Sequence, residues 1–398
     1  MLEFVIENAD PTGARAGRLS TRGHTFHTPA FLPVATQAAV KALTQAELLE
    51  LGARILLGNA YHLYLRPGIE LIQRSGGLAR FMRWPGATLT DSGGYQVFSL
   101  APLLEVSEEG VSFRSHIDGS EHLLTPESAI EIQHAIGADI IMAFDQPVGY
   151  PADPGPTREA TERSDRWAAR CLEAHHEPSR AGPRPAPQGA PGCQPAPTQA
   201  LFGIVQGGFE PDLRAQSAGR LAHLPFDGYA IGGLSVGEPK DLTFSLLSHT
   251  APLLPEDRPR YLMGVGSPAD IVRAVLSGID MFDCVLPTRL GRNGTAYTKT
   301  GKLNLKNAHY QDDLGPLDPD CGCQVCTTYS RAYLRHVYKS GEILAARCVS
   351  YHNVYLYLRL MEQIREAILA GRYREFAEDF IRRWTPMNTN LPASGGLI

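Results

Sequence analysis

Short apolar segments recur along the chain, and each of them closes on, or is directly followed by, a glycine or a polar residue. Most are followed by a stretch with helical periodicity. Near-continuous apolar runs of this kind are typical of strands that are buried on both faces, as in a parallel sheet. Eight such segments can be counted: FLPVA (31–35), RILLG (54–58), ATLTD (87–91), DIIMAFD (139–145), LFGIVQ (201–206), GYAIGG (228–233), RYLMGV (260–265) and GIDMFD (278–283).

Eight strand–helix units in a chain of 398 residues predict an α/β fold of the (β/α)8 type, a TIM barrel. One intervening helix is expected over residues 127–136, with Thr125 as its N-cap and Pro126 at the first helical position. A doubly wound sheet is the competing fold. No Gly-x-Gly-x-x-Gly follows the first predicted strand, which favours the barrel.

Three stretches depart from a plain barrel. Residues 1–28 alternate and turn at DPTGARAG, which predicts a hairpin that covers the barrel floor. Residues 111–124 predict a second hairpin around Asp118-Gly119. Residues 178–199 hold seven prolines in 22 positions and cannot build a core, so we expect a disordered insertion there, with Cys193 exposed in it.

The predicted domain organisation follows from these departures. The barrel is expected over residues 1–283, and a segment inserted after the eighth strand, which contains three closely spaced cysteines, over 284–352. Residues 353–398 are expected to complete the barrel, with helices at about 353–369 and 371–383.

Composition narrows the class of protein. Hydrophobic residues make up 43% of the chain and charged residues 20%, which is ordinary for a globular protein. The first residues lack the pattern of a signal peptide, and no run of about 18 apolar residues occurs, so we expect a soluble, cytoplasmic protein. Seven cysteines, three of them in one cluster, suit a reducing compartment and a metal site better than a disulfide framework.

Charge bears on the binding partner through one local segment and not through the chain as a whole. The net charge is −5, which does not point to nucleic acid as a partner. Residues 284–310, however, include no acidic residue and five basic ones: Arg289, Arg292, Lys299, Lys302 and Lys306. Such a run is most often a solvated face, and charge alone does not separate that explanation from an RNA-binding surface.

Polar residues stand at the carboxyl ends of the predicted strands, where catalytic groups of a barrel lie. The strand ends, in chain order, carry Asp91, Asp145, Gln206, Gly232-Gly233, Met263-Gly264 and Asp283, so three carboxylates and one amide converge there beside glycines. Paired carboxylates are the usual equipment for cleaving a glycosidic bond. A pocket rich in Asp, Gln and backbone N–H groups can also read the hydrogen-bonding edge of a purine-like base. Tyr95 and Met263 are candidates for the two faces of such a ring, with packing at the barrel mouth as the alternative.

Three thiols in the segment CGCQVC indicate part of a metal site: Cys321, Cys323 and Cys326. A tetrahedral ion requires a fourth ligand. Cys348 and His352 are both available and, four residues apart, would share one side of a helix. Spacing alone leaves two ligand sets open, either four cysteines or three cysteines and a histidine.

Several long motifs resemble one family. They are ILLGNAYHLYLRPG (55–68), TDSGGYQVFSL (90–100), FGIVQGG (202–208), YAIGGLSVGE (229–238), YLMGVG (261–266) and MFDCVLPTRLGRNG (281–294), followed by Cys-x-Cys-x-x-Cys. In this order they resemble the bacterial queuine tRNA-ribosyltransferases, the tRNA-guanine transglycosylases. The resemblance covers the whole chain except the proline-rich insertion.

The resemblance implies a pentosyltransferase of queuosine biosynthesis. It would exchange the wobble guanine (position 34) of tRNAs with a GUN anticodon, those for Asp, Asn, His and Tyr, for a 7-deazaguanine without ATP. In this family pattern Asp283 resembles the nucleophile that attacks ribose C1′, and Asp91 resembles the general acid/base. Both bases would occupy one pocket in turn, which implies double displacement through a covalent ribosyl intermediate.

The resemblance also implies binding residues. The base-binding set comprises Asp91, Ser92, Gly93, Gly94, Tyr95, Asp145, Gln206, Gly233, Leu234 and Met263. The segments that hold the anticodon loop comprise Gly264, Val265, Gly266, Ser267, Pro268, Ala269, Asp270, Thr288, Arg289, Leu290, Gly291 and Arg292. The resemblance also makes residues 284–352 an RNA-contacting segment with a zinc-binding subdomain. It selects His352, expected to open the terminal helix, as the fourth ligand of one structural zinc ion per chain. It further implies a homodimer.

One position departs from the family pattern. The bacterial motif after the fourth strand is commonly Asp-Glu-Cys, whereas this chain has Asp145-Gln146-Pro147, near the expected site of the base's 7-substituent. Val236 and Glu238 still match the bacterial type, which accepts preQ1. We therefore expect guanine and preQ1 as the exchanged bases.

Two other classes of function are weighed. A non-catalytic RNA-binding subunit would lack the nucleophile or its partner, but Asp283 and Asp91 are both present. A carbohydrate-active barrel would favour aromatic platforms at the strand ends. Trp84, Trp167 and Trp384 do not stand there.

Overall fold

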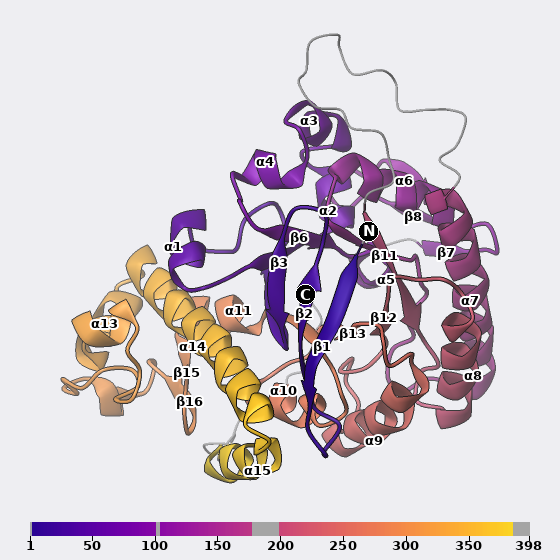
Figure 1. The fold of residues 1–398 in the computed structure, drawn as a ribbon. Helices are drawn as coiled ribbons and strands as arrows, with labels where there is room; N and C mark the ends of the chain where they lie inside the picture. The colour runs from indigo at the N-terminus through magenta and orange to yellow at the C-terminus, as the bar shows by residue number, and fades with distance from the viewer. Residues whose placement is uncertain (1, 101–103, 177–198, 385–398) are drawn as a thin grey trace.

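The computed structural model describes residues 2–100, 104–176 and 199–384. At its centre is a closed barrel of eight parallel strands (Figure 1), which confirms the predicted fold. The strands are β4 (Ala30–Ala35), β5 (Ile55–Gly58), β6 (Ala87–Thr90), β10 (Ile140–Met142), β11 (Ala200–Val205), β12 (Gly228–Ile231), β13 (Arg260–Leu262) and β14 (Met281–Cys284). Each overlaps one predicted segment, and β14 pairs with β4 to close the ring.

Alternation of side chains along each strand builds two apolar layers. In β11, Phe202 and Ile204 belong to the cluster inside the barrel, whereas Leu201 and Val205 belong to the cluster between barrel and helices. Both faces are therefore apolar, which explains the continuous apolar runs in the sequence.

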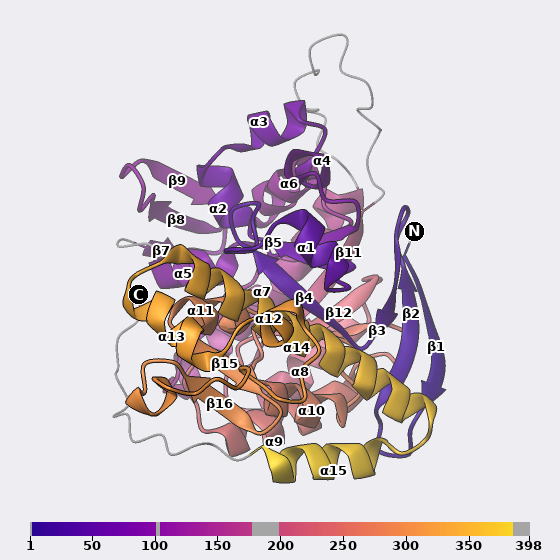
Figure 2. The same cartoon turned by 90° about the vertical axis from the view of Figure 1, so that its left-hand side faces the viewer.

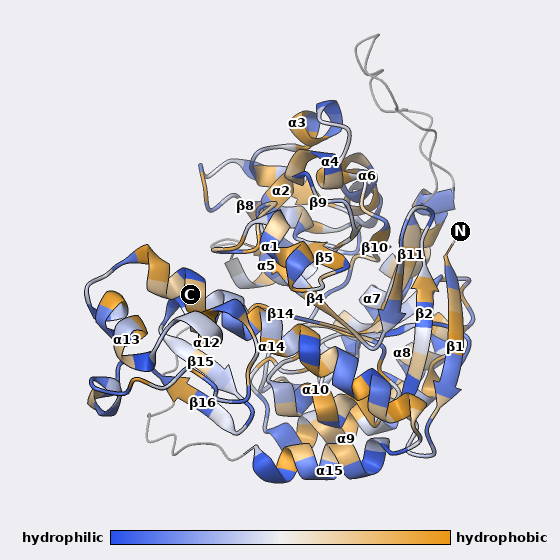
Figure 3. Ribbon diagram, turned by 60° about the vertical axis from the view of Figure 1, so that its left-hand side comes forward, coloured by the Kyte–Doolittle hydropathy of each residue, from blue (hydrophilic) through white to orange (hydrophobic). Residues whose placement is uncertain are grey.

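Most of the helices surround this barrel, and several of them carry one apolar and one polar side (Figure 3). They are α1 (Gln45–Glu50), α2 (Ala60–Leu65), α3 (Ile69–Arg74), α4 (Leu78–Met82), α5 (Gly94–Leu100), α6 (Pro126–Ile136), α7 (Pro154–His176), α8 (Pro211–Ala222), α9 (Lys240–Thr250), α10 (Pro268–Val275), α11 (Leu286–Arg292), α12 (Gln324–Thr328), α13 (Arg331–Lys339), α14 (Ile343–Leu369) and α15 (Tyr373–Arg383), with 3-10 turns at Ala251–Leu253 and Ala308–Tyr310. The predicted start of α6 is confirmed, because the Thr125 hydroxyl accepts a hydrogen bond from the N–H of Ser128 at 3.2 Å. No helix of the described ranges is long and apolar enough to cross a membrane.

Three small antiparallel sheets are added to the barrel. The first contains β1 (Glu3–Ala9), β2 (Arg15–Ser20) and β3 (Thr25–Thr28), the second β7 (Leu104–Val106), β8 (Val111–Arg114) and β9 (Glu121–Leu124), and the third β15 (Thr295–Thr298) and β16 (Gly301–Asn304). Both predicted hairpins are present, each with one further strand. Leu19 and Phe26 belong to the apolar cluster of the barrel interior, so the first sheet covers the barrel floor as predicted.

The C-terminal helices differ from the prediction. Helix α14 begins at Ile343 rather than near residue 353, and it continues through the predicted domain boundary at 352. His352 therefore lies in the middle of a 27-residue helix and does not open it. The helix extends this far because its N-terminal part packs between α11, α12 and α13, contacts that a local pattern does not show (Figure 2). The predicted insertion at 178–199 lies, apart from Gln199, outside the described residues.

A buried ion pair joins the floor sheet to the barrel. The Arg15 guanidinium donates to both carboxylate oxygens of Asp280 and to the carbonyls of Glu256 and Arg258, at 2.6 and 2.8 Å. Asp280 is fully buried and also accepts from the backbone N–H of Arg260 at 2.7 Å. Arg15 thus fixes the starts of β13 and β14, the strand that carries Asp283.

We predict that Arg15→Met destabilises the protein strongly, because it leaves the Asp280 carboxylate buried without its cation. Removing one partner of a buried pair costs about 3–5 kcal/mol, measurable by urea unfolding at pH 7. Arg18→Met on the same strand is the control, since Arg18 is half exposed and 3.9 Å from Glu7, and we expect a loss below about 1 kcal/mol. Equal losses in the two variants would contradict the assignment.

Candidate active site and metal centre

The carboxyl ends of the barrel strands bring the predicted polar residues to one mouth. Asp91 follows β6 directly, Gln206 follows β11, Asp145 lies three residues beyond β10, and Asp283 belongs to β14. The negative charge of Asp283 contributes to the raised pKa of Asp91, so the two carboxylates lie close enough to influence each other.

Asp283 is held through one oxygen. Its Oδ1 accepts hydrogen bonds from the Tyr261 hydroxyl at 2.6 Å and from the N–H of Gly264 at 2.8 Å. Its Oδ2 has no hydrogen-bond partner within the described ranges. Burial raises the pKa of the carboxyl, and the two donors counteract that rise. One oriented oxygen and one unengaged oxygen are what a carboxylate nucleophile needs.

Asp91 is engaged through both oxygens. Its Oδ1 accepts from the N–H of Ala60 at 2.9 Å, and its Oδ2 accepts from the side-chain amides of Asn59 at 2.7 Å and Gln96 at 3.0 Å. Burial, together with the charge of Asp283, raises the pKa of Asp91 to about 7. A carboxyl with that pKa can both give and accept a proton near neutral pH.

Asp145 and Gln206 form a polar wall of the same barrel mouth. Asp145 accepts from the Ser92 hydroxyl at 3.1 Å and from the Gln206 amide at 2.7 Å, and burial raises its pKa to about 6. The Oε1 atom of Gln206 is buried without a partner among the described residues. Gly233 has a φ of 65°, and a Cβ built on it would lie 2.4 Å from that Oε1, so this wall requires a glycine there. The buried, unpaired acceptor indicates space for a ligand with N–H donors.

The other residues of the predicted base-binding set have different environments. Gly94 packs against Asp145, with a Cβ position 2.9 Å from its carboxylate, and Gly93 packs against Tyr61. Leu234 is buried, Met263 is half-buried against the barrel interior, and Tyr95 is exposed on α5. The structure thus brings Asp91, Ser92, Gly94, Asp145, Gln206 and Gly233 together at the mouth.

Arg214 is a functional candidate that the sequence reading missed. It is fully buried on α8 and donates to the carbonyls of Gly208 at 2.8 Å and of Gly232 and Gly233 at 3.2 Å. Burial lowers the pKa of its guanidinium to about 10. It therefore ties together the two glycine turns that follow β11 and β12. The sequence feature that could have indicated it is an arginine on the buried side of α8, beside Leu213 and one turn before Ser217.

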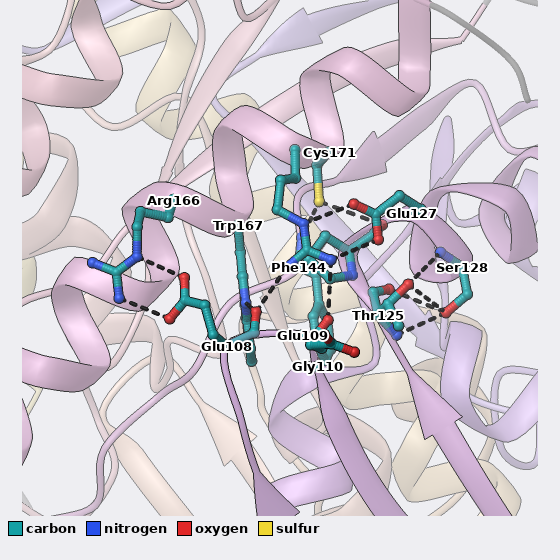
Figure 4. Close-up of polar contacts among 12 residues, drawn as sticks. Glu108, Glu109, Gly110, Thr125, Glu127, Ser128, Phe144, Arg166, Trp167 and Cys171 are labelled. Atoms are coloured by element: carbon teal, nitrogen blue, oxygen red, sulfur yellow. Dashed lines mark hydrogen bonds and ion pairs between the residues drawn. The ribbon is translucent and has the colours of Figure 1, made fainter.

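Phe144, the residue before Asp145, is held in place by side chains of α7 (Figure 4). The Trp167 ring stacks on Phe144 at 4.9 Å, and its indole N–H donates to the Glu108 carbonyl at 2.8 Å. The N–H of Phe144 donates to the Cys171 sulfur at 3.2 Å. These contacts fix the residue next to Asp145.

The two predicted RNA-contacting segments are exposed to different degrees. In residues 264–270, Val265, Pro268 and Asp270 are buried, and Asp270 accepts from the N–H of Ser267 and pairs with Lys240 at 2.9 Å. In α11, Thr288 and Gly291 are buried. The exposed members of the predicted set include Gly264, Arg289 and Arg292.

A basic cavity of about 210 Å³ lies beside the nucleophile candidate. Arg289, Arg292 and Lys41 contribute its cationic side chains, and Val285, two residues after Asp283, belongs to its wall. His62 also lines it, but burial lowers the pKa of this imidazole. Its other lining residues are Val34, Thr36, Gln37 and Thr288. Lys41 and His62 were not predicted, because they come from other parts of the chain, and only the fold brings them to α11.

The predicted metal ligands meet in one cluster. His352 Nδ1 lies 3.6, 3.5 and 3.3 Å from the sulfurs of Cys321, Cys323 and Cys326, and all four atoms lie within 4.8 Å of one another. The other ring nitrogen of His352 lies 2.6 Å from the Tyr297 carbonyl, which leaves Nδ1 free to ligate. Cys348 lies outside the cluster, and burial raises the pKa of its thiol to about 11. Three thiols and one imidazole fit a tetrahedral ion.

Comparison with known proteins shows which family the chain resembles. The family model described as Queuine tRNA-ribosyltransferase matches residues 10–386. A queuine tRNA-ribosyltransferase of Pelotomaculum thermopropionicum is 55% identical over 96% of this chain and 99% of its own length. That of Caldanaerobacter subterraneus subsp. tengcongensis is 53% identical over 96% of both chains, and that of Symbiobacterium thermophilum is 53% identical over 94% and 90%. The chain therefore belongs to the queuine tRNA-ribosyltransferase family.

Proposed function

We propose that this protein exchanges the wobble guanine at position 34 of GUN-anticodon tRNAs for a 7-deazaguanine. The observation that carries this proposal is the pair of carboxylates, Asp283 and Asp91, in one barrel mouth beside a wall of hydrogen-bond acceptors. Membership of the family supports the reaction class, and the basic cavity supports a polyanionic substrate. The tRNAs for Asp, Asn, His and Tyr are the proposed substrates.

The proposed chemistry is a double displacement. Asp283 Oδ2 attacks ribose C1′ of nucleotide 34, the C1′–N9 bond breaks, and Asp91 gives a proton to the departing guanine. The ribosyl ester on Asp283 conserves the energy of the glycosidic bond, so no ATP is needed. Asp91 then takes a proton from the incoming base, whose ring nitrogen attacks C1′ and releases Asp283.

We propose that Asp145 and Gln206 recognise the base by hydrogen bonds. With a pKa of about 6, Asp145 is largely ionised near pH 7.5 and accepts from the ring N–H and the exocyclic amine of a guanine-type base. We propose preQ1 as the incoming base, because Val236 and Glu238 match the bacterial motif. Gln146, the residue that departs from the family pattern, is bound to α7. Its backbone N–H donates to the Ser164 hydroxyl at 2.9 Å, and its side-chain oxygen accepts from Arg163 at 2.8 Å.

We propose zinc for the cluster of three cysteines and His352, with a structural role. Four protein ligands leave no open position for a reacting water. The ligands join the segment around α12 to α14, and α14 packs on α11, which carries Arg289 and Arg292. We further propose that residues 284–352 form the RNA-contacting segment, that the enzyme is a homodimer, and that it acts in the cytoplasm, where reduced thiols persist.

Replacing Asp283 by Asn should abolish the covalent tRNA adduct and lower guanine exchange by at least about 10³-fold. The amide oxygen still accepts from Tyr261 and Gly264, so the fold and tRNA binding should be preserved. Incorporation of radiolabelled guanine into unmodified tRNA and a denaturing gel for the adduct measure the two effects. An adduct at the wild-type level would show that Asp283 is not the nucleophile.

Replacing Gln96 by Met should shift the pH dependence of exchange. The Gln96 amide donates to Asp91 and lowers its pKa, so its loss raises a pKa that already stands at about 7. The limb of the kcat/KM profile that reports protonated Asp91 should move to higher pH. Ser99→Ala on the same helix, away from Asp91, is the control. A shift to lower pH, or none, would contradict the proposed role of Asp91.

Replacing Cys326 by Ser should lower the metal content, measured by elemental analysis, from one zinc per chain to well below one. Hydrogen exchange should accelerate in α12 and α13, while the barrel strands keep their protection. Cys348→Ala is the matched control, because this buried thiol lies one turn from His352 but outside the cluster. Equal loss of metal in both variants would contradict the proposed ligand set.

A further inference from the structure

The hydrogen-bonded ladder of the barrel is shortest between β6 and β10. These strands pair in register at one position, Ile140 opposite Leu89, whereas every other neighbouring pair of barrel strands is in register at two positions or more. The paired residues stand before the last residue of each strand, and Asp91 and Asp145 lie beyond those ends. The ladder therefore stops short of the mouth between the two strands that lead to these carboxylates.

The side chain of Gln133, on α6, stands where this ladder stops. It is fully buried; its Oε1 accepts from the backbone N–H of Met142 at 2.9 Å, and its Nε2 donates to the carbonyl of the same residue at 2.9 Å. Oε1 also accepts from the Thr90 hydroxyl at 3.1 Å. A primary amide offers the acceptor and the donor of a peptide group, so Gln133 satisfies two backbone groups of β10 that a neighbouring strand would otherwise bind.

The amide of Gln133 has no hydrogen-bonding capacity left. Its fourth hydrogen bond runs from Nε2 to the Ala129 carbonyl, 3.1 Å away on the same helix. Two acceptor sites and two N–H donors are thus all used. A glutamate here would place a carboxylate against the Met142 carbonyl, and an apolar side chain would leave both backbone groups of Met142 buried without partners. The position therefore requires an amide, and that amide is unavailable to a substrate.

The two strand ends that this amide joins are those that carry carboxylates of the mouth. Thr90 directly precedes Asp91, and Met142 stands three residues before Asp145. A second link, the hydrogen bond from the Ser92 hydroxyl to Asp145 at 3.1 Å, lies in the mouth itself. The relative position of the two carboxylates is thus fixed from two sides, by Ser92 in the mouth and by the buried amide on the helix side of the strands.

We propose that Gln133 is a positioning residue for the base exchange. By joining β6 to β10 next to the mouth, it sets the distance between Asp91, which moves the proton, and Asp145, which recognises the base. This inference rests on the proposed function, which supplies the roles of the two carboxylates. The base must meet both carboxylates at once when its bond to ribose is made or broken, so a small displacement of one strand end slows the reaction.

The test uses two variants that remove the link in steps. Gln133→Met keeps the length of the side chain but removes the amide, and we expect kcat/KM for guanine to fall about 10- to 100-fold, since misplacement by about 1 Å can cost about 10² in rate. Thr90→Val removes only the bond to β6, with an expected loss of about 3- to 10-fold. Because both act on one link, the double variant should lose no more than Gln133→Met alone. Incorporation of radiolabelled guanine into unmodified tRNA measures these losses.

Two readouts separate positioning from a loss of stability alone. The Kd for tRNA should stay within about twofold of the wild-type value, because phosphate contacts do not depend on the link. The limb of the pH profile assigned to Asp91 should not move, because Asn59 and Gln96, which donate to that carboxylate, do not contact Gln133. A residue that only stabilises the barrel would lower the Tm and leave kcat/KM of the folded enzyme unchanged.

Thr88→Val is the matched control for Thr90→Val. Thr88 lies on the same strand and the same face, is equally buried, and its hydroxyl donates to Asp139 at 3.3 Å, at the opposite end of β6 and β10. The control variant should therefore keep the wild-type kcat/KM at a Tm similar to that of Thr90→Val.

Several results would overturn the positioning role. They are a wild-type kcat/KM in folded Gln133→Met, equal losses in Thr88→Val and Thr90→Val, a shifted pH limb, or a double variant that loses more than Gln133→Met. If Gln133→Met does not fold, the comparison of Thr90→Val with its control decides. If wild-type protein incorporates no guanine, the proposed function fails and the positioning role with it, whereas wild-type exchange with unaffected variants overturns the positioning role alone.

Discussion

Enclosure of three carboxylates at one end of a closed barrel is the constraint on which the site depends. A buried charge is costly unless donors surround it, and here most of the donors come from the end of a neighbouring strand. Asp283 uses Tyr261 and Gly264, and Asp91 uses Asn59 and Gln96. The barrel supplies these donors because parallel strands end at the same level. Burial still raises the pKa values of these carboxyls. It contributes to a pKa of about 7 for Asp91, at which the group can give and accept protons near neutral pH.

The parts outside the mouth maintain this arrangement. The ion pair between Arg15 and Asp280 anchors the start of β14, three residues before Asp283. Arg214 holds the glycine turns beside Gln206, and Trp167 holds the residue next to Asp145. Each acts on the backbone of a strand end rather than on the reacting atoms. Displacements smaller than a bond length matter in such a site, so these supports are part of its chemistry.

Most of the ligand set was predictable because chain order and spacing carry it. Three cysteines within six residues define a metal site, and His352 stands where a helix brings it to them. The start of α14 was predicted wrongly, since the preceding turns are helical only in contact with α11 and α13. Lys41 and His62 were missed for a similar reason: neither has a local pattern, and both reach the basic cavity only through the closure of the barrel.

The sequence by itself determined the eight strands, their parallel arrangement and the polar residues at their ends, because burial on both faces imposes continuous apolar runs. It also determined the cysteine cluster, because the three thiols are close along the chain. Only the tertiary structure decided which donors meet Asp91 and Asp283, since most of those donors follow other strands. Contacts between distant segments depend on three-dimensional packing, which no local pattern encodes.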